Sequence, residues 1–503
     1  MKKTRKVLLT VLSVLTIAAV SLGAASCELL EEYLPSIIGP SSSSTSSSSS
    51  SPTEDSSSGS SSTEDSSSED SSSEITEPTG TEGVLYQISS DGTYAQVVGY
   101  EGTAEKVKIA DTYNDLPVKT ICEEAFYDNR TITSVVIPDS VTSIGSSAFQ
   151  YCSSLTSVVI GDSVTSIGSS AFQYCSSLTS VVIGDSVTAI GSSAFESCSS
   201  LTSVVIGDSV TSIGSCAFYD CDSLTSVVIP DSVTSIGEGA FAYCSSLTSV
   251  EIPDSVTSIG EYAFRNCSRL TSVVIGDSVT SIGELAFASC SSLTSVVIGN
   301  GVTSIGNSAF NGCSSLTSVV IPDSVTSIGE NAFEYCYKLV EVVNQSTHIT
   351  VEKGSSSNGY VGYYALAVYN SGDTFESKLS IDNGYIIYTD GEEKILVGYT
   401  GTETDLVLPD YVTKINRNAF RECDSLTSVV IGNSVTSIGY FAFYNCRSLT
   451  SVYYKGTESE WSAISIGSDV FYNTNATRYY YSETEPISAG RYWHYVDGKV
   501  TVW

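Results

Sequence analysis

The sequence predicts an elongated solenoid that is mainly β, with short helical turns. One observation is a fixed period: the 23-residue unit LTSVVIGDSVTSIGSSAFQYCSS at 155–177 recurs almost letter for letter. The other is a sharp division within the unit between apolar positions and small polar ones. A period of this size indicates coils that bury their apolar side chains only when neighbouring coils stack in register. Copies begin at Ile132, Leu155, Leu178, Leu201, Leu224, Leu247, Leu270, Leu293, Leu316, Glu403, Leu426 and Leu449.

Three segments of the unit carry a family resemblance. Leu-x-x-Val-x-Ile at 155–160, Val-x-x-Ile-Gly at 164–168 and Ala-Phe-x-x-Cys at 171–175 resemble the leucine-rich repeats of BspA-like bacterial surface proteins. The match covers residues 132–345 and 403–452. It implies a leucine-rich repeat solenoid and an adhesin that binds host matrix and plasma proteins such as fibronectin and fibrinogen. A solenoid supplies a surface, so the resemblance implies a class of partner without naming one.

Residues 1–26 have the pattern of an export signal. The basic start MKKTRK precedes an apolar run from Val7 to Gly23 and a small-residue stretch, Ala24-Ala25-Ser26. Together with Cys27, that stretch resembles a bacterial lipobox, which implies lipidation of Cys27 and anchoring at the outer face of the cell membrane. The alternative is ordinary secretion after cleavage near Ala25.

Residues 27–82 are expected to form a stalk. Ser41 to Ser50 is nearly pure serine, and acidic pairs follow it. Such a segment has too few apolar residues to offset the entropy lost on folding, so we expect disorder. The stalk would lift the repeats away from the membrane, or its length could reflect replication slippage alone.

Residues 83–131 are expected to cap the solenoid. The alternating segments of 84–99 flank the turn sequence Ser89 to Gly92, which predicts a β-hairpin over the first coil. Residues 104–131 would form an irregular first repeat that ends in Ala125-Phe126.

The regular repeats of 132–339 predict a strand at LTSVVI, a turn, a second extended stretch at SVTSIG and a tight helical turn at SSAFQYC. Because strand side chains alternate, Val158 and Ile160 should face inward and Val159 outward. The same place is filled by Val136, Val159, Val182, Val205, Val228, Glu251, Val274, Val297, Val320 and Val430.

An exposed apolar column on a protein surface can mark a binding site. The alternative is that valine simply suits strands and has been copied with the repeat. The candidate ligand-binding residues are Val159, Val182, Val205, Val228, Glu251, Val274 and Val297.

Cysteine and aspartate each recur at one place in the repeat. Eleven of the 14 cysteines share the place of Cys175, and stacked equivalents point the same way, so we favour buried free thiols over a ladder of disulfides. The aspartates at the turns, such as Asp162, are expected to hydrogen-bond within their own turn rather than to bind Ca²⁺. Zinc-ligand spacing is absent, and we expect no metal and no cofactor.

The chain beyond 339 departs from the period. Residues 340–402 predict a β insertion with a hairpin around Asp390-Gly391, and residues 403–452 resume the repeat. Residues 453–503 are rich in Tyr and Trp and should form a C-terminal cap over the last exposed core. A platform for carbohydrate is the alternative function of these aromatics.

The charge and the missing motifs exclude several functions. A formal charge of -34, with almost no Lys or Arg in the repeats, argues against nucleic acid and against anionic lipid, leaving a lipid anchor as the only membrane contact. The chain has no G-x-S-x-G, P-loop or dinucleotide fingerprint, so we expect no enzyme. The sequence therefore predicts an adhesin for extracellular protein. Its alternatives are a self-associating surface component and a glycan-binding protein.

Overall fold

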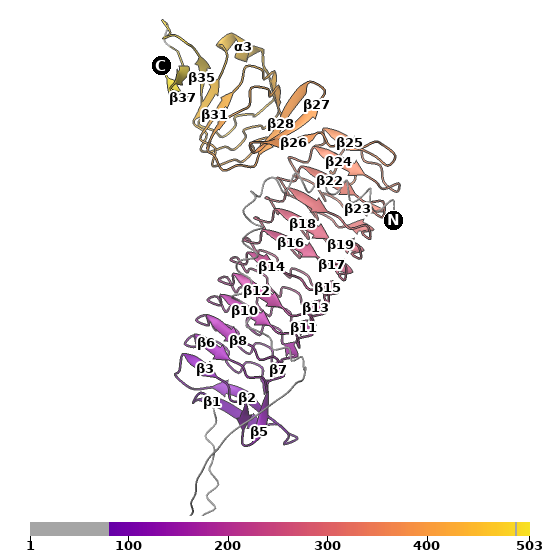
Figure 1. Cartoon of the computed structure of the whole chain (residues 1–503), viewed down its shortest axis with the longest axis vertical. Helices are drawn as coiled ribbons and strands as arrows, with labels where there is room; N and C mark the ends of the chain where they lie inside the picture. The colour runs from indigo at the N-terminus through magenta and orange to yellow at the C-terminus, as the bar shows by residue number, and fades with distance from the viewer. Residues whose placement is uncertain (1–79, 488–489) are drawn as a thin grey trace, which may run out of the picture.

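The computed structural model describes residues 80–487 and 490–503. It shows a long stack of coils, drawn indigo to pink in Figure 1, followed by a smaller stack drawn orange to yellow. The expected signal peptide, Cys27 and residues 28–79 of the expected stalk lie outside the described residues. The mainly β solenoid predicted from the 23-residue period is confirmed.

The long stack begins with a hairpin. β1 (Val84–Ile88) pairs antiparallel with β2 (Ala95–Tyr100), as the alternating sequence predicts. β2 then pairs parallel with β5 (Leu116–Ile121), to which β4 (Thr112–Tyr113) also pairs. The hairpin therefore covers the open edge of the first coil.

One strand of each coil comes from the SVTSIG segment and extends that sheet. These strands are β7 (Ser143–Ile144), β9 (Ser166–Ile167), β11 (Ala189–Ile190), β13 (Ser212–Ile213), β15 (Ser235–Ile236), β17 (Ser258–Ile259), β19 (Ser281–Ile282), β21 (Ser304–Ile305) and β23 (Ser327–Ile328).

The other strand of each coil comes from LTSVVI and forms a second column, divided into three parallel sheets. The first holds β3 (Lys106–Lys108), β6 (Ser134–Val136), β8 (Ser157–Val159), β10 (Ser180–Ile183), β12 (Ser203–Ile206) and β14 (Ser226–Val227). The second holds β16 (Ser249–Ile252), β18 (Ser272–Ile275) and β20 (Ser295–Val297), and the third β22 (Ser318–Ile321), β24 (Glu341–Asn344) and β25 (Ala367–Tyr369).

Neighbouring coils stack with a constant offset of 23 residues. Ser180 lies opposite Ser203, and the next three residues of the two strands follow in register. Threonines reinforce the stack: the Thr156 hydroxyl donates to the carbonyl of Thr133 at 2.8 Å, and the same bond recurs in later coils. The Ser- and Thr-rich outside of the unit thus supplies hydrogen bonds between coils.

The corner predicted as a helical turn consists of consecutive hydrogen-bonded turns. The Ala148 amide donates to the carbonyl of Gly145, three residues back, but the Phe149 amide donates to Ala171 of the next coil at 2.8 Å. Ser147 before the alanine has a φ of 54°, in the left-handed region. Some corner amides thus close turns within the coil, while others bind the next coil.

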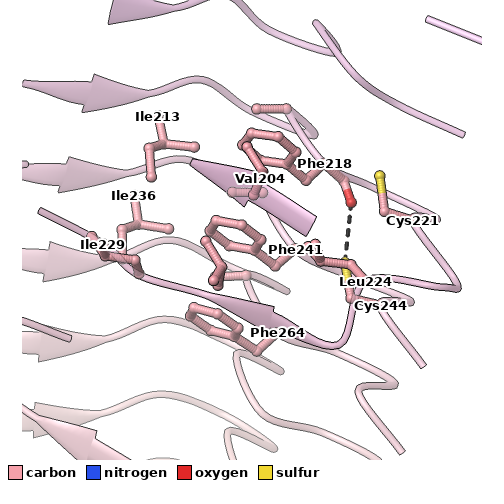
Figure 2. Close-up of a cluster of buried hydrophobic side chains, with 14 of the residues drawn as sticks. Val204, Ile213, Phe218, Cys221, Leu224, Ile229, Ile236, Phe241, Cys244 and Phe264 are labelled. Carbon is pink, nitrogen blue, oxygen red and sulfur yellow. Dashed lines mark hydrogen bonds between the residues drawn. The ribbon is translucent and has the colours of Figure 1, made fainter. Parts of the chain in front are cut away.

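A ladder of phenylalanines forms the centre of the core. The rings of Phe218, Phe241 and Phe264 stack with centroids 5.3 Å apart and lie nearly parallel (Figure 2). Such rings bury a large apolar area, and their close packing fixes the spacing of the coils. The ladder of this stack comprises Phe126, Phe149, Phe172, Phe195, Phe218, Phe241, Phe264, Phe287, Phe310 and Phe333.

The cysteine column lies beside this ladder as free thiols, as predicted. Every cysteine in residues 80–487 is free, and those of the column are buried except Cys423, which is half-buried. The Cys244 thiol donates to the carbonyl of Phe218 at 3.2 Å, the bond dashed in Figure 2. Burial raises the pKa of the Cys198 thiol to about 12, so these thiols stay protonated.

A glycine column sets how closely the coils approach. A Cβ on Gly191 would lie 2.5 Å from the carbonyl carbon of Gly168 in the preceding coil. A side chain there would push the two coils apart. The first coil after each hairpin is different, since Cys122 and Asn416 stand at this place.

The smaller stack also begins with a hairpin, where the sequence predicts one around Asp390-Gly391. Its first sheet holds β26 (Leu379–Asp382), β27 (Tyr385–Asp390), β28 (Glu393–Tyr399), β30 (Lys414–Ile415), β32 (Ser437–Ile438) and β34 (Ser465–Ile466). Its second holds β29 (Asp405–Val407), β31 (Ser428–Ile431), β33 (Ser451–Tyr454), β35 (Thr477–Tyr481), β36 (Tyr492–Val496) and β37 (Lys499–Val502).

The segment 340–402 therefore has two parts. Its first part continues the long stack, because β24 pairs with β22 and β25 pairs with β24. Its second part is the hairpin of the smaller stack. The two hairpins share five of six residues in one segment, VGYEGT at 98–103 and VGYTGT at 397–402. The two hairpins also share a hydrogen bond, from Glu101 to the carbonyl of Gly83 and from Thr400 to that of Gly384. The segment expected as one insertion thus includes a second N-terminal cap.

The two stacks meet through this second hairpin. Ile386, Tyr388 and Val397 form a small buried cluster with Val340 of the long stack. Tyr385, Ile387 and Leu396 join the core of the smaller stack. The hairpin therefore contributes to both cores.

Arginines of the smaller stack add contacts at the junction. The Arg417 guanidinium lies 4.9 Å from the ring centroid of Tyr364, and Arg421 lies 4.5 Å from that of Tyr337. Stacking of a cation on an aromatic face contributes about 0.5–2 kcal/mol, so these contacts help to hold the stacks together.

The chain ends in an aromatic seal. Trp461 lies on α3 (Glu458–Ala463), a short helix whose N-terminus is closed by a capping box between Thr457 and Glu460. Trp461 and Trp493 are buried, and the Trp493 indole N–H donates to the Tyr454 carbonyl at 2.9 Å. These contacts fit the predicted C-terminal cap. Among the residues that the structure describes, no helix has the length and apolar character needed to cross a bilayer.

Candidate binding surface

The predicted outward column is most exposed in four consecutive coils. Val159, Val182, Val205 and Val228 are 57%, 60%, 56% and 79% exposed, whereas their neighbour Val158 is 8% exposed. The parallel register puts equivalent residues of adjacent strands side by side, as for Val182 and Val205. The valines therefore form one narrow apolar strip along the sheet.

The strip changes character in the following coils. Glu251 occupies the same place and is exposed, and it lies opposite Val274 in the next strand. Val274 and Val297 are half-buried. Of the candidate residues, the first four valines and Glu251 are therefore the most accessible, while the last two offer less surface.

The prediction of exposure is wrong for Val430. This valine lies in the smaller stack and is only 2% exposed. It pairs in register with Tyr453, whose ring stacks on Tyr479 at 5.3 Å. Aromatic side chains thus continue the column in this stack, and the valine beside them is covered.

The aspartates at the turn after each strand lie beside the strip. Asp139, Asp162, Asp185, Asp208, Asp231, Asp254, Asp277 and Asp323 are all exposed. Asp139 accepts a hydrogen bond through Oδ1 from the backbone N–H of Asp162 in the next coil at 3.0 Å, and Asp185 does the same for Asp208. The sequence predicts a bond within the turn, but these bonds link successive coils.

The C-terminal aromatics divide into a buried group and an exposed group. Trp461 and Trp493 are buried in the seal and offer no stacking face. Trp503 and Tyr495 are exposed, and His494 stacks on Trp503 with ring centroids 3.7 Å apart. The large aromatics that a carbohydrate platform would need are thus mainly occupied by the cap.

No metal-binding cluster gathers in the described part of the chain. Within residues 80–487 and 490–503, no three of the His, Cys, Asp and Glu side chains lie close enough to hold an ion together. The carboxylates of the turns follow one another singly, one per coil. Cys27, the expected lipidation site, lies outside the described residues.

Several solved structures resemble the chain. A leucine-rich repeat protein from Bacteroides ovatus is 26% identical over 80% of this chain and 93% of its own, with a TM-score of 0.46. A leucine-rich cell surface protein from Faecalibacterium prausnitzii is also 26% identical, over 77% and 98%, with a TM-score of 0.32. The pneumococcal vaccine antigen PcpA is 17% identical over 81% and 94%, with a TM-score of 0.35. No curated relative matches.

The family model of the BspA type leucine rich repeat region matches residues 119–248, 234–358 and 399–490, which is more than half of the chain. These ranges hold the coils, the phenylalanine ladders and the valine strip described above. Proteins of this type are bacterial cell-surface proteins, and leucine-rich repeat solenoids are generally not enzymes. The chain belongs to the family of BspA-type leucine-rich repeat proteins.

Proposed function

We propose that this chain is a bacterial surface adhesin that binds an extracellular protein through the valine strip. The observation that carries the proposal is the exposure of Val159, Val182, Val205 and Val228 at equivalent places of four stacked coils. Each coil is held to the next by a backbone ladder and by threonine hydrogen bonds. A partner can therefore bury apolar surface there without ordering the sheet first, which lowers the entropic cost of binding.

The proposed location is the outer face of the cell membrane. A lipid on Cys27 would hold the chain there, and the Ser-rich segment that follows would carry the repeats outward. Growth with a labelled fatty acid tests this step. We expect the label on the natural chain and none on Cys27→Ser, and a label on that variant would contradict the anchor.

The binding test replaces three valines of the strip. Val182→Lys, Val205→Lys and Val228→Lys together place charges where a partner would bury apolar surface, and we expect loss of capture by immobilised fibronectin or fibrinogen. The exposed Glu251 at the equivalent place indicates that the fold accepts a charged side chain there. Unchanged capture by a folded triple variant would contradict the proposal.

A matched control adds the same charge elsewhere. Gln150→Lys, Gln173→Lys and Asn311→Lys lie after the corner phenylalanines, away from the strip, and should leave capture unchanged. Self-association is the competing function, since two strips could also cover each other. Sedimentation of the purified chain separates the two: assembly that depends on the valines and on protein concentration would favour self-association.

A further inference from the structure

Beyond the valines themselves, the strip has a strongly one-sided charge environment. Residues 131–264, which contain the whole exposed strip, include no lysine, arginine or histidine, and every charged residue there is Asp or Glu. Basic residues occur at the two ends of this stretch, at Arg130 and Arg265. The charged surface of these six coils is therefore entirely acidic.

Many of these acids lie at the edge of the strip. Each aspartate follows its valine by three residues, as Asp162 follows Val159, and is exposed at the turn that ends the strand. Stacked coils place these carboxylates about 5 Å apart. Asp139 and Asp185 use Oδ1 for the amide of the next coil, and their Oδ2 atoms have no hydrogen-bond partner among the described residues. These two carboxylates are thus held in place by the next coil while one oxygen of each stays free to contact a ligand.

Charge complementarity then restricts what can cover the strip. A ligand that buries the valines must also approach this row and Glu251, and a carboxylate that loses water without gaining a cation is costly. A second copy of the same face would bring like charges together, and so would nucleic acid or a sulfated glycan. A segment with basic and apolar side chains gains both apolar contact and ion pairs.

We propose that the strip of coils 132–264 binds a cationic polypeptide segment, whose apolar side chains cover the valines and whose lysines or arginines meet the aspartate row. This inference rests on the proposed function and adds the chemistry of the partner to it. The row supplies long-range attraction, so the association rate should fall as salt increases. The valines supply contact that salt does not screen.

The test uses the mature full-length chain and synthetic peptides of defined sequence. We expect a ten-residue peptide of alternating Lys and Val to bind and its Glu-Val counterpart not to bind, as measured by fluorescence anisotropy. Affinity should fall when NaCl is raised from low to high concentration. Equal binding of the two peptides would contradict the proposal.

Charge variants of the chain localise the effect. Asp162→Asn, Asp185→Asn, Asp208→Asn and Asp231→Asn together remove four charges of the row and should weaken Lys-Val binding roughly tenfold or more. Asn at 185 keeps an oxygen for the amide of Asp208. The control removes four charges near the corner instead: Glu196→Gln, Asp220→Asn, Glu238→Gln and Glu261→Gln. An equal loss in the control would show attraction to net charge alone and would overturn the proposed site.

The two proposals fail in different ways. If the aspartate variant captures matrix protein as the natural chain does, while the valine variant does not, the cationic partner is excluded and the adhesive strip stands. If the valine variant captures matrix protein normally, the strip itself is not the binding site.

Discussion

The long stack of residues 84–369 and the smaller stack of residues 379–502 begin with the same kind of hairpin but differ in length and ending. The long stack has ten phenylalanines in its ladder, whereas the smaller one has three, Phe420, Phe443 and Phe471. The long stack ends against the second hairpin, and the smaller one ends in the Trp and Tyr seal. In such stacks each coil depends on its neighbours, so a short stack depends more on its caps.

Loss of one phenylalanine ring from the ladder should give the clearest difference in stability between the two stacks. Phe241→Ala and Phe443→Ala each remove a fully buried ring, at a cost of about 3–5 kcal/mol. In the long stack, distant coils should keep their hydrogen-exchange protection. In the smaller stack, residues 403–452 should lose protection together, because few coils remain.

Leucine at the same positions serves as the control, since it fills more of the space and should cost less. Hydrogen exchange monitored by mass spectrometry measures the amide protection of both stacks in one experiment. Retained protection in coils 403–452 of the Phe443→Ala variant would contradict the dependence on length.

A smaller effect is expected at the glycine column. Gly191→Ala puts a Cβ 2.5 Å from the backbone of the preceding coil and should destabilise the long stack by about 1–3 kcal/mol. Asn416→Gly changes the equivalent place in the first coil of the smaller stack, where a side chain is already accommodated, and should cost about 1 kcal/mol or less. Urea unfolding curves measure both, and a larger cost at Asn416 would be inconsistent with this explanation.

Alkaline pH should act mainly on the long stack, which holds nine buried column thiols against one in the smaller stack. Burial raises the pKa of Cys198 and Cys290 to about 12, above an unfolded value of about 8.5. The contribution of such a thiol is complete below the unfolded pKa and is lost as pH rises towards the folded one. At pH 9.5 each of these two thiols should reduce the free energy of unfolding by about 1.4 kcal/mol relative to neutral pH.

Circular dichroism during urea unfolding at pH 7.5 and 9.5 measures this loss. Cys198→Ala with Cys290→Ala should reduce the difference between the two pH values, even if the variant is less stable at both. The corresponding variant of the smaller stack, Cys446→Ala, provides the comparison. No change in pH dependence for the double variant would refute the thiol explanation.

The structure of the repeat could be predicted from sequence because each coil places the same residue types at the same positions. Alternation along LTSVVI was enough to predict that Val158 is buried and Val159 exposed. The cysteine column was predictable for the same reason, since stacked equivalents share one orientation. These features depend only on the period and on the strand geometry.

The features that sequence reasoning missed depend on the neighbouring coil. Asp139 bonds to an amide 23 residues away, which no local turn pattern indicates. Val430 is buried because Tyr453 lies beside it in the next strand. The second hairpin cap could have been found from the shared VGY-x-GT sequence, but its break in the period makes it resemble an insertion.

The constant register of the coils has a consequence for how such a gene can change. Because Ser180 faces Ser203 and Ser203 faces Ser226, loss of one whole unit, such as residues 178–200, would bring equivalent surfaces together. Recombination between nearly identical repeats could thus lengthen or shorten the rod in steps of about 5 Å while both ends stay intact. The number of contact points offered to a partner could vary between strains without any new fold.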